Sequence, residues 1–307
     1  MTTGADNAKW WHLAQLNVAT LRAPLDHPSI HEFRDHLAPI NALADSSEGF
    51  VWRLQTDSGD ATDVQVFDDP LTIVNLTVWH SVAALRAFAY AGDHRDFLRR
   101  KAEWFTDVGR RTALWYLPAG ALPTTDDALH RLAFLERFGE TGYVFSTPRD
   151  HTPVVVTDHP VTDSVSVELI NELDAELVAA GPGTNFLTLL PHEVAPGVGA
   201  FVVAWLDGVP VGCGAVRRLD AGRAEIKRMY VRAGGRGTKV GAALLHELER
   251  RAVDIGAESL VLETGPAQVA ALALYRRVGF VACACWGEYA QSPTSHCFEK
   301  RLDRLPG

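Results

Sequence analysis

Apolar and polar positions alternate with different periods along the first half of the chain, and each period predicts an element. Residues 12–19 alternate between apolar and polar side chains, which is typical of a strand with one buried face. Residues 30–45 place apolar side chains three and four positions apart, which predicts a helix. We expect further strands at residues 50–55, 71–79, 113–117 and 143–146, and further helices at residues 81–90, 97–108 and 123–138. This order fits a ferredoxin-like α+β sandwich.

The second half has a different order of elements. A helical spacing over residues 166–180 is followed by a meander of predicted strands at residues 200–205, 211–217 and 223–231. Asp207-Gly208 and Asp220-Ala221-Gly222 are typical hairpin turns between them. The pattern then predicts helices at residues 242–249 and 269–278 and strands at residues 260–263, 281–286 and 296–300.

A short polar segment with a proline, residues 149–153, is the best candidate for a domain boundary. A chain of 307 residues favours two domains over one. We therefore expect a domain over residues 1–148, a linker over 149–160 and a second domain over 161–307.

Composition excludes several classes of partner. The formal net charge of −9 argues against a nucleic-acid-binding protein, which usually has a basic face. The longest apolar runs are too short to cross a bilayer, and residues 1–7 do not resemble a signal peptide, so we expect a cytoplasmic protein with no membrane partner. The four cysteines do not form a Cys-x-x-Cys pair, and the predicted state is reduced thiols. His31 and His36 have poor spacing for a helical metal site, so we expect no metal.

The run Arg236-Gly237-Thr238-Lys239-Val240-Gly241 lies between a predicted strand and a predicted helix. The first N–H groups of a helix have no carbonyl partner within it, and the helix dipole favours an anion there. The run therefore indicates a phosphate-bearing ligand.

Three motifs in order make the second half resemble the GNAT family of N-acetyltransferases. They are the glycine run 236–241, the helix 271–280 with its Leu274-Tyr275 and Gly279-Phe280 pairs, and the terminal strand 297–302. The resemblance implies a GNAT fold with a mixed, splayed central sheet and acetyl-CoA as cosubstrate. It also implies that the loop residues Arg236, Gly237, Thr238, Lys239, Val240 and Gly241 hold the CoA pyrophosphate. Met229, Tyr230 and Val231 would pair with the pantetheine arm beside a strand bulge.

The same resemblance assigns roles to two side chains. Tyr275 matches the tyrosine that lies near the CoA sulfur, so it would protonate the departing thiolate; otherwise it is an aromatic packing residue. Glu225, in the context Ala-Glu-Ile, would take the proton of the attacking amine; otherwise it is a strand carboxylate paired with Lys227 or Arg228. Glu263 on the next predicted strand is a second candidate base.

Lys239 is the departure from the family pattern, which has glycine at this position. Its side chain would either crowd the pyrophosphate or point away from the start of the helix and meet a CoA phosphate. We expect the second arrangement, because the first positions of a helix accept side chains that face solvent.

The first half resembles a small bacterial family of unassigned function, related in architecture to the dimeric α+β barrels that include antibiotic-biosynthesis monooxygenases. Segments 12–17, 49–54, 74–79 and 101–105 carry the likeness. It implies a ferredoxin-like dimeric α+β barrel and a homodimer. Trp79, His80, His94 and Trp104 would line a pocket. Otherwise the tryptophans belong to the core and the histidines are capping or surface groups.

The function that these residues predict is transfer of an acetyl group to a primary amine by direct attack in a ternary complex. The alternative is a non-catalytic acyl-CoA sensor or assembly module, with the first domain as a dimerisation or ligand-binding unit. An oxidative activity in the first half is a third class, but its residues name no cofactor. The acceptor, a small molecule or a peptide, stays open; residues 181–199 and 286–295, with Tyr289 and His296, are expected to shape its pocket.

Overall fold

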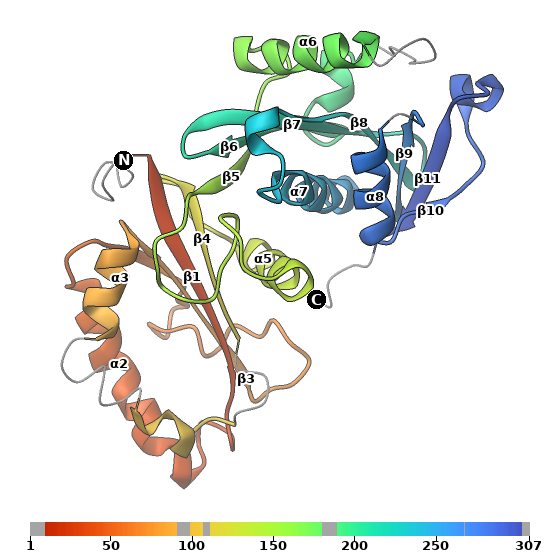
Figure 1. Ribbon diagram of the computed structural model, residues 1–307. Coiled ribbons are helices and arrows are strands. Elements are labelled where there is room, and N and C mark those ends of the chain that lie inside the picture. Colours follow the sequence, from red (N-terminus) through yellow and green to blue (C-terminus); the bar gives the residue numbers. More distant parts are fainter. Residues whose placement is uncertain (1–9, 91–98, 107–110, 180–188, 267, 303–307) are drawn as a thin grey trace. The chain divides into compact units, whose positions relative to one another are not determined.

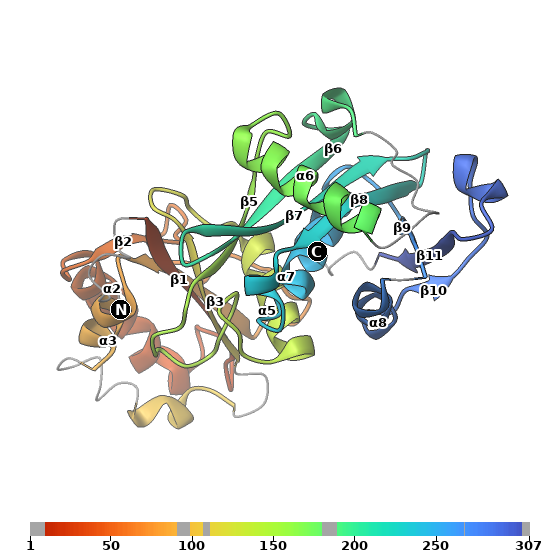
Figure 2. The same cartoon turned by 45° about the horizontal axis from the view of Figure 1, so that its top comes forward.

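Two compact units make up the chain, and they divide between Val155 and Val156. The computed structural model describes residues 10–90, 99–106, 111–179, 189–266 and 268–302 (Figures 1 and 2).

An antiparallel sheet forms the centre of the N-terminal unit. Its strands, in spatial order, are β2 (Phe50–Arg53), β3 (Thr72–Trp79), β1 (Trp11–Thr20) and β4 (Arg111–Pro118). Helices α2 (His31–Asp45) and α3 (Val82–Ala89) cover one face, and α5 (Thr125–Phe138) covers the other (Figure 1). The elements follow the predicted order through β4.

Local capping explains where the helices of this unit begin and end. The Ser81 hydroxyl accepts a hydrogen bond from the Ala84 N–H and caps α3. Thr124 and Asp127 form a capping box at the start of α5, and Gly139 ends that helix with a φ of 72°.

Two predicted elements of the first half are wrong or only partly visible. Residues 143–146 form no strand, because the Thr141 hydroxyl holds the N–H groups of Tyr143 and Val144 in a turn. Only Phe145 reaches the sheet, through an isolated bridge to Leu114. Of the helix predicted over residues 97–108, the structure describes 99–106, where residues 99–100 are α-helical and Lys101–Glu103 form a 3₁₀ turn.

A mixed sheet forms the centre of the C-terminal unit. Its spatial order is β10 (Val281–Ala282), β11 (His296–Arg301), β9 (Ser259–Thr264), β8 (Arg223–Val231), β7 (Val209–Arg218), β6 (Gly199–Leu206) and β5 (Val154–Asp158). β8 pairs with β9 in parallel, whereas β7 is antiparallel to both of its neighbours β6 and β8. The strand β5 lies within the segment that we expected to be a linker.

Helices cover both faces of this second sheet. α6 (Ser164–Ala179) lies on one face, and α7 (Val240–Asp254) and α8 (Val269–Arg277) lie on the other (Figure 1). α7 packs closely on β7, where a Cβ atom added at Gly214 would come within 2.8 Å of the Leu248 side chain. Glycine at this position therefore sets the distance between α7 and the sheet.

The prediction that all four cysteines are reduced thiols is wrong for two of them. Cys285 and Cys297 form a disulfide, with Cα atoms 5.3 Å apart, and Cys213 and Cys283 are free. Cys285 and Cys297 meet because residues 286–295 leave the sheet after β10, form a 3₁₀ turn at Gly287–Gln291 and return as β11. Sequence spacing alone does not reveal such a return.

Several other expectations concern single side chains. Trp79 and Trp104 are buried core residues, while His94 lies outside the described residues. No cluster of three potential metal ligands occurs among the residues that the structure describes. Within the same part of the chain, no helix combines the length and the apolar character that a membrane span requires.

Candidate functional site

A β-bulge interrupts β8 shortly before its end. Arg228 has a φ of +55°, and the pairing register with β7 shifts between Cys213 and Ala215. On the other side of β8, the parallel pairs with β9 stop at Ile226 opposite Leu262. The two strands therefore part beyond this pair, as the family resemblance predicted.

A cavity of about 90 Å³ lies where β8 and β9 part. Charged and aromatic side chains contribute to its lining together with apolar residues of α6 and the sheet. The residues that carry chemistry there are Lys227, Arg228, Met229, Glu263, Tyr275 and Tyr289. The cavity thus brings together residues from β8, β9, α8 and the 3₁₀ turn after β10.

Tyr275 reaches this cavity from α8. Its side chain is buried, and its hydroxyl donates a hydrogen bond to the Met229 thioether at 3.7 Å, a weak acceptor. Burial, with a smaller contribution from the Glu263 charge, raises the pKa of the Tyr275 hydroxyl. The hydroxyl therefore stays protonated at neutral pH and is available as a proton donor.

Glu225 is fully buried on β8, beside the cavity. Arg217 on β7 donates to its Oε2 at 2.8 Å, and the Tyr289 hydroxyl donates to its Oε1 at 3.1 Å. The alternative was that Glu225 pairs with Lys227 or Arg228; the hydrogen-bond partners of Glu225 are Arg217 and Tyr289, while Arg228 pairs with Asp174 of α6. Tyr289 both lines the cavity and contacts Glu225, so it connects this buried carboxylate with the cavity.

Glu263 lines the cavity directly, from β9. Burial raises the pKa of its carboxyl, and the nearby Glu225 charge raises it further. A carboxyl whose pKa is raised in this way is a stronger base and can accept a proton. The geometry keeps Glu263 as a candidate base beside Glu225.

The glycine run forms the loop that leads from β8 into α7. Gly237 has a φ of +82° and Lys239 a φ of +64°, and α7 begins at Val240. The left-handed backbone at position 239 explains why the family pattern has glycine there. Lys239 is exposed and is the N-cap of α7 rather than one of its first helical positions, and its expected contact with a CoA phosphate stays a prediction.

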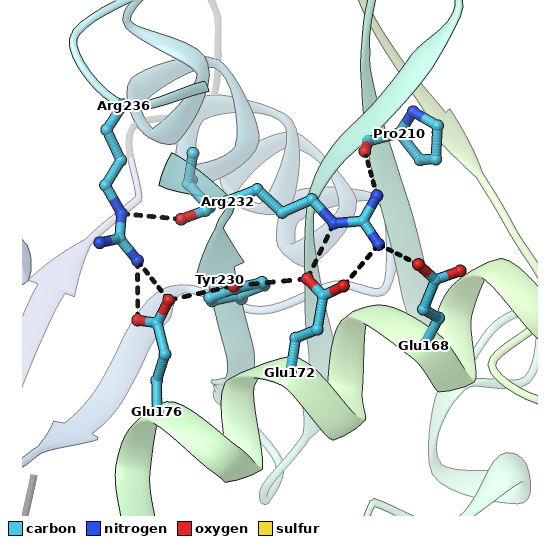
Figure 3. A network of polar contacts seen from close by, with 8 residues as sticks. Glu168, Glu172, Glu176, Pro210, Tyr230, Arg232 and Arg236 are labelled. Carbon is cyan, nitrogen blue, oxygen red and sulfur yellow. Dashed lines mark hydrogen bonds and ion pairs between the residues drawn. The ribbon is translucent and has the colours of Figure 1, made fainter. Parts of the chain in front are cut away.

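Arg236 has one carboxylate partner, Glu176, among the described residues. Its guanidinium pairs with Glu176 of α6 at 2.7 Å and donates to the Val231 carbonyl (Figure 3). Sequence reasoning placed Arg236 beside a phosphate and missed this contact. Any anion at the loop competes with Glu176 for the same guanidinium.

An acidic ladder on α6 joins this helix to the end of β8 and to the loop. Glu168, Glu172 and Glu176 lie four residues apart, so they share one face of the helix. Arg232 contacts Glu168 and Glu172, while the Tyr230 hydroxyl donates to Glu176 at 3.1 Å (Figure 3). The acidic ladder therefore fixes the position of residues 230–236, directly before the helix start.

The N-terminal unit has a larger cavity of about 350 Å³ between its sheet and α2. Phe33, Leu37 and Ile40 of α2 form one apolar wall. Uncharged polar side chains of the strands face them, namely Gln15, Asn17, Asn75, Thr77 and Thr112. Trp79, His80 and Trp104, which we considered as pocket residues, do not contribute to the described lining of this cavity.

Comparison with known proteins separates the two units. Residues 12–159 match a family model described as a domain of unknown function (DUF3291). Residues 168–280 match the model of the acetyltransferase (GNAT) family. An IAA acetyltransferase of Azospirillum brasilense is 38% identical over 150 residues, which cover 48% of this chain and 97% of that protein. The chain belongs to the GNAT family.

Solved structures with similar folds also match about half of this GNAT chain. A Klebsiella pneumoniae protein described as an acyl-CoA N-acyltransferase is 32% identical, with a TM-score of 0.43, and the match covers 49% of this chain and 98% of that one. A GNAT acetyltransferase of Elizabethkingia anophelis with acetyl-CoA bound is 17% identical, with a TM-score of 0.35. The match covers 48% of this chain and 98% of that one.

This GNAT protein is an acyltransferase. Of the site residues selected from the sequence, only some lie together at its cavity. Met229, Glu263, Tyr275 and Tyr289 meet at one cavity, and Glu225 lies beside it. His296 is exposed on β11, outside the described lining. Lys227 was considered only as a partner of Glu225, and its position in the cavity was missed. The sequence did contain an indication of this position, since Lys227 lies within a strand whose other residues are buried or partly buried.

Proposed function

We propose that the C-terminal unit transfers an acetyl group from acetyl-CoA to a primary amine, by direct attack within a ternary complex. The observation that carries the proposal is the cavity at the end of the β8–β9 pairing, lined by Glu263 and Tyr275. It holds a proton donor and a candidate proton acceptor at the same point, as acyl transfer to an amine requires.

Two backbone features fit the donor. Residues Met229, Tyr230 and Val231 follow the last β8–β9 pair, so the side of β8 that faced β9 is open to the amide groups of pantetheine. Arg236, Gly237, Thr238, Lys239, Val240 and Gly241 lead into the 15-residue helix α7, whose first N–H groups suit a pyrophosphate. Acetyl-CoA would supply the activated acetyl group as a thioester.

The proton of the amine would leave through Tyr289. Tyr289 lines the cavity and its hydroxyl donates to Glu225, so the hydroxyl would accept a proton from the amine while passing its own to the carboxylate. Glu263 is the alternative acceptor, in direct contact with the cavity. Tyr275 would then give its proton to the departing thiolate.

The test is release of CoA thiol from acetyl-CoA by the full-length protein, measured across panels of amines, amino acids and peptides. We expect release that depends on the amine and matches the amount of N-acetylated product. Calorimetry with acetyl-CoA separates the rival function. Binding of acetyl-CoA without CoA release on any panel would favour an acyl-CoA sensor. Absence of both acetyl-CoA binding and CoA release would refute the proposal.

The N-terminal unit is proposed to be a ferredoxin-like α+β barrel that forms a homodimer. Its support is the strand order β2-β3-β1-β4 together with the alternation of strands and helices. Light scattering of the full-length protein tests the dimer: a monomer at micromolar concentration would refute it. A cytoplasmic location is likewise a proposal, which localisation of a tagged protein would test.

A further inference from the structure

Lys227 is buried in the acetyl-transfer cavity without a hydrogen-bond partner. Its side chain belongs to a residue that is only 8% exposed, and its Nζ has no acceptor among the described residues. Lysine is rarely buried in this way, because an ammonium group loses its hydration and needs compensation. The cavity lining includes Lys227, so a ligand in the cavity can reach it.

Two charged neighbours of Lys227 are engaged with other groups, while Glu263 of the same cavity lining also lies within electrostatic reach. Glu225 is held by Arg217 and Tyr289, and Arg228 is held by Asp174. Burial lowers the pKa of the Lys227 ammonium, Arg217 and Arg228 lower it further, and Glu225 and Glu288 offset this in part. Carboxylates therefore lie near Lys227, but none of those in the described part of the chain accepts a hydrogen bond from its Nζ.

We propose that Lys227 binds a carboxylate of the acceptor, so that the acceptor is an amine that also carries a carboxylic acid, such as an amino acid. The inference rests on the proposed acetyl transfer, whose acceptor class it defines. A bound carboxylate would satisfy the Nζ donors with charge-assisted hydrogen bonds.

The shape of the cavity suits such an acceptor. About 90 Å³ has room for a few water molecules or for a compact polar head group. Lys227 lies on β8, while the proton-handling side chains Glu263 and Tyr289 come from other elements of the same lining. An amino acid head group can thus direct its acid to Lys227 and its amine toward these side chains.

The first test compares amines with and without the acid. Acetylation of L-leucine and L-leucinamide, and of β-alanine and β-alaninamide, is measured with the wild-type protein and with Lys227→Met and Lys227→Arg. We expect Lys227→Met to lower the ratio of kcat/KM for acid over amide by at least about tenfold, the value of one charged hydrogen bond. Lys227→Arg should retain part of the preference. Differences in amine basicity cancel when the ratio is compared between variants.

A matched control is Lys300→Met in the same sheet. Lys300 pairs with Glu249 and lies outside the described cavity lining, so its loss should leave the acid-to-amide ratio unchanged. An equal loss of acid and amide turnover in Lys227→Met, or an unchanged ratio, would overturn the proposal and point to a structural or proton-transfer role.

A second test does not require turnover. Calorimetry in the presence of CoA measures binding of N-acetyl-L-leucine and N-acetyl-L-leucinamide to the same variants. We expect the acid to bind the wild-type protein at least about tenfold more tightly than it binds Lys227→Met, with little change for the amide. Equal binding of acid and amide to the wild-type protein would refute the role of Lys227. Absence of CoA release in the first test would refute acetyl transfer separately.

Discussion

The two cavities of this protein differ in size and in the chemistry of their walls. The C-terminal cavity measures about 90 Å³ and includes Lys227, Glu263 and Tyr275, whose pKa values are all changed by burial. The N-terminal cavity measures about 350 Å³, and its lining combines amides and hydroxyls such as Asn17 and Thr112 with the charged groups of Arg53 and Asp60. The first brings together buried groups that can transfer protons, whereas the second has room for a larger ligand.

The largest effect that this comparison predicts is on turnover. Tyr275→Phe removes the proton donor of the C-terminal cavity while keeping the ring that packs against Phe280. We expect kcat to fall by about 10²–10⁴, the usual contribution of a general acid, with acetyl-CoA affinity nearly unchanged. Steady-state kinetics and calorimetry measure the two quantities. Wild-type turnover in this variant would remove Tyr275 from the mechanism.

A stability effect should come from the disulfide that closes the segment carrying Tyr289. Cys285 and Cys297 are 12 residues apart, so loss of their bond in Cys285→Ser should cost about 3 kcal/mol of unfolding free energy. Denaturant unfolding measures the change, with Cys283→Ser as the control because Cys283 is a free thiol. Titration of the unfolded wild-type protein should find two thiols before reduction and four after it. Four thiols before reduction would contradict the disulfide.

A smaller effect should separate two glycines of the loop before α7. Gly237 has a φ of +82°, so Gly237→Ala should cost about 1–2 kcal/mol in strained backbone. At Gly241 an added Cβ would meet its nearest neighbour, Leu274, at an ordinary 3.5 Å, so Gly241→Ala should change stability by less than about 0.5 kcal/mol. Thermal unfolding of both variants provides the measurement. Equal losses of stability in the two variants would mean that the positive φ at Gly237 does not cause the loss.

The pH dependence of stability should also distinguish the cavities. Because burial raises the pKa of Glu263, the folded state binds its proton more tightly than the unfolded state does. Between the unfolded and folded pKa values, stability contributed by this group is present at lower pH and is lost as pH rises. Glu263→Gln should therefore reduce the fall of stability with rising pH across this window. Denaturant titrations at several pH values, with Asp60→Asn in the N-terminal cavity as control, measure the difference. If the unfolding free energy of Glu263→Gln changed with pH as steeply as that of the wild-type protein, the result would contradict this prediction.

Much of the fold could be predicted because local signals determine it. β8 has the predicted bounds Arg223–Val231, and Gly139 ends α5 as expected. The splay of β8 from β9 followed from family resemblance. The run Val154-Val155-Val156 was passed over as part of a linker, although its apolar character is typical of a buried strand.

The parts that could not be predicted depend on contacts between distant segments. The spacing of Glu168, Glu172 and Glu176 shows one helix face, but only the fold brings Arg232 and Arg236 to it, about 60 residues later in the chain. The same holds for Lys227, because only the fold shows that its Nζ has no hydrogen-bond partner among the described residues. Burial and pairing of charges are tertiary properties, and strand alternation does not determine them.

Hydrogen exchange of the full-length protein with and without acetyl-CoA tests most directly which cavity performs the transfer. The account predicts slower exchange on acetyl-CoA binding at the N–H groups of residues 229–231 and 236–241, and no change in β1 and β3 of the N-terminal unit. Slower exchange confined to β1, β3 and α2, with residues 229–241 unaffected, would contradict the assignment of acetyl transfer to the C-terminal cavity.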